Sequence, residues 1–152
     1  MRVHMIAVGR AKAGPERAVF DLYAGRLTPA LILREVEERR PLPAAERTTR
    51  EGELLLTAVP PGATVVALDG RGRTASSEDF AGRLRGWRDG GVADLAFLIG
   101  GADGHSSAVR GRADLLLSLG AMTWPHMLVR GLLAEQLFRA QCILCNHPYH
   151  RA

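Results

Sequence analysis

The sequence contains almost no lysine. Lys12 is the single lysine among 20 basic residues, and the other 19 are arginine. With 16 acidic residues, the net charge is +4 at pH 7 and the isoelectric point is about 9.8. Arginine suits phosphate binding and planar stacking, so this bias favours an RNA partner. A GC-rich gene also favours arginine over lysine, so the charge alone leaves both explanations open.

Long apolar runs and cysteines are also scarce. No apolar run approaches the ~20 residues that a membrane-spanning helix needs. The apolar part of the initial MRVHMIAVGRAKAG is too short for a signal peptide and predicts a first strand instead. Cys142 and Cys145 are the only cysteines. These features predict a cytoplasmic protein that contacts no membrane and keeps its thiols reduced.

Several motifs that define enzyme classes are absent. The dinucleotide fingerprint G-x-G-x-x-G, the P-loop and the nucleophile elbow G-x-S-x-G do not occur. The spacing Cys142-x-x-Cys145-x-His147-x-x-His150 permits a zinc site, but familiar sites separate their two ligand pairs by a longer loop. Packing of two small thiols at a helix end is the favoured interpretation, so we predict no metal.

The 152 residues predict one domain, 1–152, of the α/β class. Continuous apolar strands alternate with helices, which indicates a mostly parallel sheet with helices on both faces. The expected strands are Val3–Val8, Leu31–Val36, Ala63–Leu68, Leu95–Ile99 and Leu115–Leu119. The expected helices are Pro15–Arg26, Glu46–Val59, one capped by Ser76 or Ser77 and ending at Arg88, a short one from Ser106 or Ser107, and a long one after Pro125.

Two connections between these elements have a distinctive composition. Asp69–Arg73 is rich in glycine and predicts a turn after a central strand. Glu37–Arg50 is charged and contains two prolines, which predicts a flexible connection.

The long helix after Pro125 is apolar nearly all the way round. An ordinary amphipathic helix buries one stripe, so this helix needs cover on several sides, from its own sheet and from a second copy of the chain. It still carries charges, which require partners or a function in such surroundings. Glu135 and Arg139, spaced i, i+4, fit either a simple helix ion pair or a functional pair.

Two glycine-containing loops follow neighbouring strands of the expected sheet. Gly100–Gly104 follows one strand and Gly120–Pro125 follows the next. Glycine at the carboxyl end of a strand permits a ligand to approach the backbone closely, although a tight turn explains the first loop equally well. With Leu68 as a wall, the two loops predict a pocket for an adenosine-like group.

The C-terminal segment Asn146–Arg151 combines an aromatic ring, two imidazoles and a guanidinium. This combination suits stacking on a base and holding phosphate. A tail that simply packs on the protein surface is the alternative.

Three motifs in order, LIGGADG, LSLGAMTWPHMLVRGLLAEQLFRA and NHPYHR, closely resemble the ribosomal RNA large-subunit methyltransferase H family. This family belongs to the SPOUT, or α/β-knot, methyltransferases. The resemblance is strongest over 95–151 and weakest over 37–61. It implies a C-terminal deep trefoil knot and a homodimer. It also implies methyl transfer from S-adenosylmethionine to N3 of a pseudouridine in the helix 69 loop of 23S rRNA, on the assembled ribosome.

The resemblance also implies roles for particular residues, in a site that combines the cofactor loop of one protomer with the tail of the other. Cofactor contacts are expected from Leu68, Gly101, Gly120, Ala121, Met122, Thr123, Trp124 and Pro125. The candidate catalytic residues are Glu135, Arg139 and His150, with Glu135 or His150 as the base. The candidate RNA-binding residues are His126, Arg130, Tyr149 and Arg151.

The sequence departs from the family pattern at three places. Ala102 and Asp103 stand where the glycine loop usually has proline and glutamate, and Met127 stands where proline is common. Asp103 is one methylene shorter than glutamate, which limits the reach of that acid. A non-catalytic RNA- or ribosome-binding module that keeps the knotted fold is the alternative function.

Overall fold

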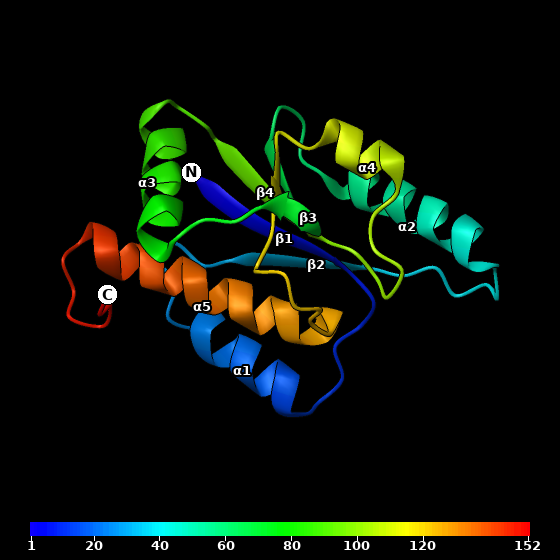
Figure 1. Cartoon of the computed structure of the whole chain (residues 1–152), viewed down its shortest axis with the longest axis horizontal. Coiled ribbons are helices and arrows are strands. Elements are labelled where there is room, and N and C mark those ends of the chain that lie inside the picture. Colours follow the sequence, from blue (N-terminus) through cyan, green and yellow to red (C-terminus); the bar gives the residue numbers. More distant parts are fainter.

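Five parallel strands form the centre of the protein, in the order β2-β1-β4-β3-β5 (Figure 1). The computed structural model describes residues 1–152. The strands are β1 (Arg2–Val8), β2 (Ile32–Val36), β3 (Thr64–Arg73), β4 (Asp94–Ile99) and β5 (Leu115–Leu117). The helices are α1 (Pro15–Ala24), α2 (Ala44–Ala58), α3 (Ser77–Asp89), α4 (Ser107–Arg112) and α5 (His126–Leu144). The predicted α/β architecture with a parallel sheet is confirmed.

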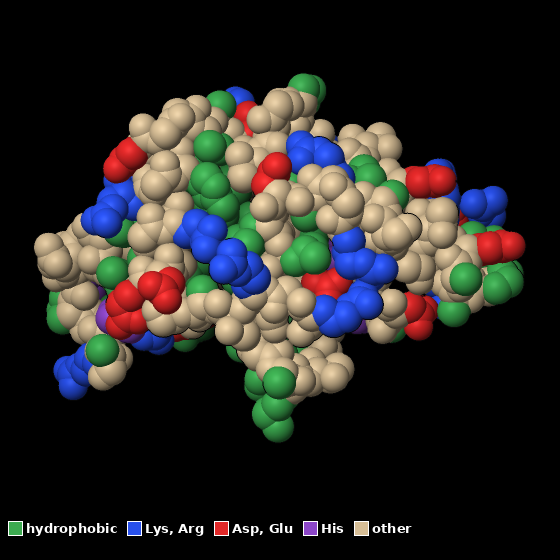
Figure 2. All heavy atoms as spheres, turned by 45° about the horizontal axis from the view of Figure 1, so that its top comes forward, with side chains coloured by type: hydrophobic (Ala, Val, Ile, Leu, Met, Phe, Trp, Pro, Cys, Tyr) green, Lys and Arg blue, Asp and Glu red, His purple; other side chains and the backbone are tan.

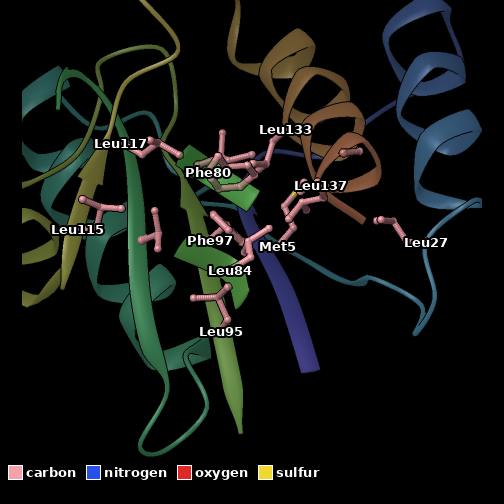
Figure 3. Packing of buried hydrophobic residues seen from close by; sticks show 14 of the residues in the cluster. Met5, Leu27, Phe80, Leu84, Leu95, Phe97, Leu115, Leu117, Leu133 and Leu137 are labelled. Carbon is pink, nitrogen blue, oxygen red and sulfur yellow. The ribbon is translucent and has the colours of Figure 1, made fainter. Parts of the chain in front are cut away.

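Helices cover both faces of the sheet. Helices α1, α3 and α5 lie on one face and α2 and α4 on the other (Figure 1). Side chains of a strand alternate between the two faces. In β1, Met5 and Ala7 therefore join the larger core, whereas Ile6 and Val8 join the smaller one. Figure 3 shows the larger core, where Phe97 of β4 packs between Phe80 of α3 and Met5.

Local signals set several helix ends as predicted. Ser76 and Ser106 are the N-caps of α3 and α4, and their hydroxyls accept bonds from backbone amides in the first turn. At the end of α5, Asn146 adopts a positive φ of 58°. The Asn146 amide donates to Ile143 O, and the His147 amide donates to Cys142 O. This Schellman arrangement ends the helix and turns the tail back along it.

Helix α5 is covered by α1, α3 and the sheet. Gly131 permits the close approach of α1, because a Cβ there would stand 2.8 Å from Val19 Cγ1. Leu133 and Leu137 are buried against the sheet, while Leu128 and Leu132 remain partly exposed. No helix combines the length and apolar character needed to cross a bilayer.

The sequence predicted a turn at Asp69–Arg73, but the structure has no simple turn there. β3 continues through it and bulges, so that Leu68 and Arg73 both lie opposite Leu117 of β5. A Cβ at Gly72 would stand 2.6 Å from the Leu116 carbonyl, so the backbones meet there without a side chain between them.

β5 ends two residues earlier than predicted. The Ser118 amide still donates to Arg73 O at the end of β3, but the Ser118 hydroxyl bonds to Gly120 O and accepts from the Gly120 amide, which turns the chain away from the strand. The bulge of β3 and the early end of β5 are therefore parts of one local arrangement.

The connection before α2 is also better defined than expected. Helix α2 begins at Ala44, two residues before the predicted start, with Pro43 at its N-cap. Glu38 accepts hydrogen bonds from Arg40 and Arg50. The bond from Arg40 lowers the pKa of Glu38 to about 2. The predicted connection is therefore shorter than expected, because its second half is helical, and the charges that remain in it pair with one another.

Substitution of Gly52 tests how closely α2 packs on α4. A Cβ at Gly52 would stand 2.3 Å from Ser106 Oγ and 3.2 Å from Val109 Cγ2. We predict that Gly52→Ala lowers the free energy of unfolding by about 1–3 kcal/mol through overpacking. Gly82→Ala in α3 is the control, because nothing lies within 4 Å of its Cβ. There alanine should stabilise the helix by about 0.5–1 kcal/mol. Urea unfolding of both variants measures the difference, and equal effects would contradict the close packing.

Candidate functional site

The carboxyl ends of β3, β4 and β5 meet at one edge of the sheet. Leu68 pairs with Ile99 of β4 and with Leu117 of β5. Both predicted glycine loops leave from this edge, one after Ile99 and one shortly after Leu117. In open α/β sheets, ligands bind outside the carboxyl ends of the strands.

A cavity of about 300 Å³ lies at this edge. It is lined by the two glycine loops, by Leu68 and by the first residues of the β3 bulge. All of the predicted cofactor contacts line it except Pro125, which is the N-cap of α5. The members of that set on the cavity wall are Leu68, Gly101, Gly120, Ala121, Met122, Thr123 and Trp124.

The loop Gly100–Gly104 has no room for a side chain at its first two residues. A Cβ at Gly100 would stand 3.0 Å from Gly104 O, and one at Gly101 would stand 2.9 Å from Glu51 Oε2. Gly104 adopts a positive φ of 80°, and its amide donates to Gly101 O. The chain therefore presents bare main chain to the cavity, as a ligand held by backbone hydrogen bonds requires.

The second loop is held at its start and exposed at its centre. Gly120, with φ 118°, donates its amide to Ser118 Oγ at 3.1 Å. Met122 is 77% exposed and Trp124 is 42% exposed. Two large apolar side chains therefore face outward beside the cavity.

Two imidazoles border the same cavity, the buried His105 and the half-buried His126. Burial lowers the pKa of His105 and also that of His126, so both rings favour the neutral form. His105 Nε2 lies 3.3 Å from Leu98 O, a carbonyl that can only accept, so Nε2 carries the proton. His105 Nδ1 is then a buried acceptor, and it has no partner.

The predicted catalytic residues and Tyr149 form a single cluster. Glu135 Oε1 accepts bonds from Arg139 Nε and from the Tyr149 hydroxyl, both at 2.9 Å. His150 lies between Arg139 Nη1, 3.2 Å from its Nδ1, and Glu78 Oε1, 2.7 Å from its Nε2. The Tyr149 ring packs edge-on against Phe138 with centroids 4.8 Å apart. Burial raises the pKa of the Tyr149 phenol, which keeps it a donor to Glu135.

This cluster borders a second cavity. Glu135 and Arg139 line a space of about 680 Å³, together with residues of α1 and α3. Leu119, Gly120 and Trp124 line both cavities. The second loop is therefore a shared wall between the glycine-lined cavity and the charged cluster.

The remaining predicted RNA-binding residues lie in different places. Arg151 is exposed and makes no hydrogen bond or ion pair, and His126 is half-buried at the first cavity. Arg130 is only 1% exposed. Its guanidinium pairs with Glu35 at 2.6 Å and donates to Gly9 O at 2.8 Å. This placement does not support an RNA contact by Arg130, because its guanidinium is occupied inside the protein.

Basic side chains do not form one continuous surface. On the face drawn in Figure 2, Lys and Arg side chains form several separate groups with acidic side chains among them. Many arginines are paired locally, as Arg88 is with Asp89 and Arg112 with Asp114. This face therefore offers no single basic patch, only individual arginines.

The C-terminal cysteines have a structural environment. Cys142 is buried and Cys145 exposed, and burial raises the pKa of the Cys142 thiol. No group of three or more His, Cys, Asp or Glu side chains comes together in a way that could hold a metal.

Sequence reasoning missed three residues of the site. Glu78 appeared only as an acid at a helix N-terminus, yet it contacts His150. Glu51 and His105 carried no local signal, because their position beside the glycine loop depends on how α2 and α4 pack.

Known proteins resemble this chain over its whole length. A family model described as "Predicted SPOUT methyltransferase" matches residues 1–150. Ribosomal RNA large subunit methyltransferase H of Paramagnetospirillum magneticum is 64% identical over 151 residues, which cover 99% of each chain. The protein of the same name in Rhodospirillum centenum is 60% identical over 152 residues, all of each chain.

One solved structure has a similar fold. It is described as a probable methylase family protein from Haemophilus influenzae Rd KW20. Its TM-score is 0.57 at 8% identity, over 99% of this chain and 70% of that one. At this identity the likeness concerns the fold alone.

Substitution of the buried Arg130 tests its structural role. We predict that Arg130→Met lowers the free energy of unfolding by about 1–3 kcal/mol, because Glu35 and two carbonyls lose their charged donor. Arg83→Met on α3 is the control, since Arg83 is exposed and should change stability by no more than about 0.5 kcal/mol. Urea unfolding at one fixed protein concentration compares them. Equal unfolding midpoints would show that the bonds of Arg130 do not hold α5 in place.

Proposed function

The chain belongs to the ribosomal RNA large subunit methyltransferase H family of SPOUT methyltransferases, and we propose that it methylates N3 of a pseudouridine in the helix 69 loop of 23S rRNA. The methyl donor is S-adenosylmethionine, and the substrate is the assembled ribosome in the cytoplasm. Membership confirms the resemblance inferred from the three C-terminal motifs. The donor and the target nucleotide are the parts that we propose.

One observation carries the proposal. The loop after β5 separates a glycine-lined cavity from a second cavity that contains Glu135 and Arg139. A methyl donor on one side of this loop and a nucleotide on the other would meet at its edge, near Trp124. Alignment of the two reactants can supply a large part of the acceleration in such a transfer.

The first cavity fits an adenosyl group. Its walls offer bare main chain from two glycine loops and apolar side chains such as Leu68 and Val129. His105 Nδ1 is a buried acceptor that lacks a partner beside it. Bound S-adenosylmethionine would supply an electrophilic methyl group there, so the protein itself needs to orient the nucleotide and to accept one proton.

The charged cluster can perform both tasks. Arg139 places a positive charge where negative charge develops on the uracil oxygens as N3 loses its proton. Glu135 or His150 accepts that proton while the bond from sulfur to the methyl carbon breaks and the bond from N3 forms. Glu135 already accepts bonds from Arg139 and Tyr149, so the entering nucleotide must displace one of these donors.

The apolar surface beside the second cavity supports a homodimer. Val19 and Trp124 are exposed by 36% and 42%, and with Leu132 they line the second cavity. A second protomer on this face would cover them and could add its own Tyr149, His150 and Arg151 to the site. This arrangement accounts for the surplus of apolar residues on α5.

The bulge of β3 supports the proposed trefoil knot. The segment Asp69–Arg73 bulges around β5, with Gly72 against the Leu116 backbone and Arg73 O bonded to the Ser118 amide. We propose that the chain after β5 threads through this region. Threading would hold in place the loop Gly120–Pro125, which forms the wall shared by the two cavities.

The direct test is methyl transfer to ribosomes from a strain that lacks this chain. Purified protein and labelled S-adenosylmethionine should add one methyl group per ribosome at N3 of a helix 69 pseudouridine, mapped by mass spectrometry of RNA fragments. Ribosomes from the parent strain, which are already modified, are the control. RNA binding without methyl transfer would favour the non-catalytic module instead.

The tail gives a separate prediction. Deletion of 149–152 removes Tyr149 and His150 from Glu135 and Arg139. Methyl transfer should fall at least about 100-fold, as expected when a proton acceptor and its positioning groups are lost. Binding of S-adenosylmethionine by calorimetry should remain nearly unchanged, because the tail does not line the first cavity. Removal of Ala152 alone is the control. Methyl transfer retained after the larger deletion would exclude a catalytic role for the tail.

A further inference from the structure

Glu51 of α2 is a buried carboxylate without a partner. The residue is 8% exposed, yet its side chain makes no hydrogen bond and no ion pair. Other buried charges are paired, as Asp94 is with Arg2 and Arg130 is with Glu35. The Glu51 oxygens keep some contact with solvent, because the fully buried polar atoms without a partner are His105 Nδ1 and Arg130 Nε. A largely buried carboxylate without a donor in the protein still requires an explanation.

The carboxylate faces the glycine loop of the proposed cofactor cavity. Its two oxygens are 2.9 and 3.1 Å from the position that a Gly101 Cβ would occupy. Gly52, the next residue, fixes this placement because it permits α2 to contact Ser106 at the start of α4. Glu51 therefore contacts the loop without lining the cavity.

The backbone amides of the Gly100–Gly104 loop are potential hydrogen-bond donors. Its one internal backbone bond joins the Gly104 amide to Gly101 O. Gly101 and Gly104 form an isolated antiparallel bridge, and the exposed Ala102 and Asp103 have amides with no acceptor in the protein. The Glu51 carboxylate therefore lies next to Gly101, in a loop that has free amides and lines the cavity.

Nearby charges do not satisfy Glu51. Arg47 is the closest attractive charge, but its guanidinium donates to Leu42 O at 2.7 Å and lies 3.9 Å from Asp103. Asp103 and Glu38 repel the carboxylate. Burial raises the pKa of Glu51, as expected for a carboxyl that lacks donors. Donors on the glycine loop are the remaining partners within reach.

We propose that Glu51 is a positioning residue for the cofactor: its carboxylate accepts hydrogen bonds from the amides of the Gly101–Asp103 segment when this loop closes on the bound adenosyl group. The inference rests on the proposed function, because it assumes that the cavity binds S-adenosylmethionine. Glu51 does not touch the cofactor in this arrangement. It acts through the loop, whose ligand-bound form it stabilises.

The test compares Glu51→Gln with Glu53→Gln, an exposed glutamate on the same helix. Calorimetry with S-adenosylmethionine and with S-adenosylhomocysteine should show about 5- to 30-fold weaker binding of both by Glu51→Gln, the effect of losing charged hydrogen bonds. Glu53→Gln should bind like the wild type. Glu51→Asp, which keeps the charge on a shorter side chain, should fall between them.

Two further readouts separate positioning from a merely structural role. The melting temperature of ligand-free Glu51→Gln should be unchanged or raised, because an unpartnered buried charge is removed. Hydrogen exchange at the amides of Ala102 and Asp103 should slow when the wild type binds ligand, and should slow less in the variant. A lower melting temperature with wild-type affinity would assign Glu51 a structural role and overturn the proposal.

The two proposals fail in different ways. Wild-type protein that binds neither ligand would overturn the proposed function, and this inference with it. Wild-type protein that binds ligand, together with Glu51→Gln that binds equally tightly, would overturn this inference alone.

Discussion

The ion pair between the buried Arg130 and the partly exposed Glu35 holds the start of α5 on the sheet, and the rest of the site depends on that position. The guanidinium joins α5 to β2 through Glu35 and to the end of β1 through the carbonyls of Val8 and Gly9. Loss of Arg130 would leave Glu35 and both carbonyls without this charged donor. Because these bonds anchor α5 to β1 and β2, the loop that precedes the helix and the tail that follows it have defined places.

Two cavities with one shared wall lie beside this helix. The strand edge supplies glycine loops to the first cavity, and α5 supplies Glu135 and Arg139 to the second. The tail reaches the same helix because Asn146 ends it in a left-handed conformation and reverses the chain. The two cavities are thus built from different segments that share the loop of Trp124.

Two polar side chains beside the glycine loop lack hydrogen-bond partners in the protein. His105 Nδ1 is fully buried near Gly100, and the Glu51 carboxylate lies next to Gly101. Buried polar groups in folded proteins are nearly always satisfied, so these two groups mark the loop as a place where a ligand or a second loop conformation can supply partners. Arg130 Nε, the other fully buried atom without a partner, lies elsewhere, at the start of α5. The charged cluster around Glu135, by contrast, is already hydrogen-bonded within the chain.

The sequence by itself determined the order of helices and strands, the parallel sheet, the serine caps and the family. These follow from apolar periodicity, local capping and motif spacing, which act over a few residues. Only the tertiary structure decided which charges meet. Arg130 finds Glu35 at a separation of 95 residues, and His150 finds Glu78 at a separation of 72. Such partners are fixed by the packing of whole elements, which no local pattern encodes. For the same reason, the sequence suggested an RNA contact for Arg130, which is buried, and gave no sign of Glu51.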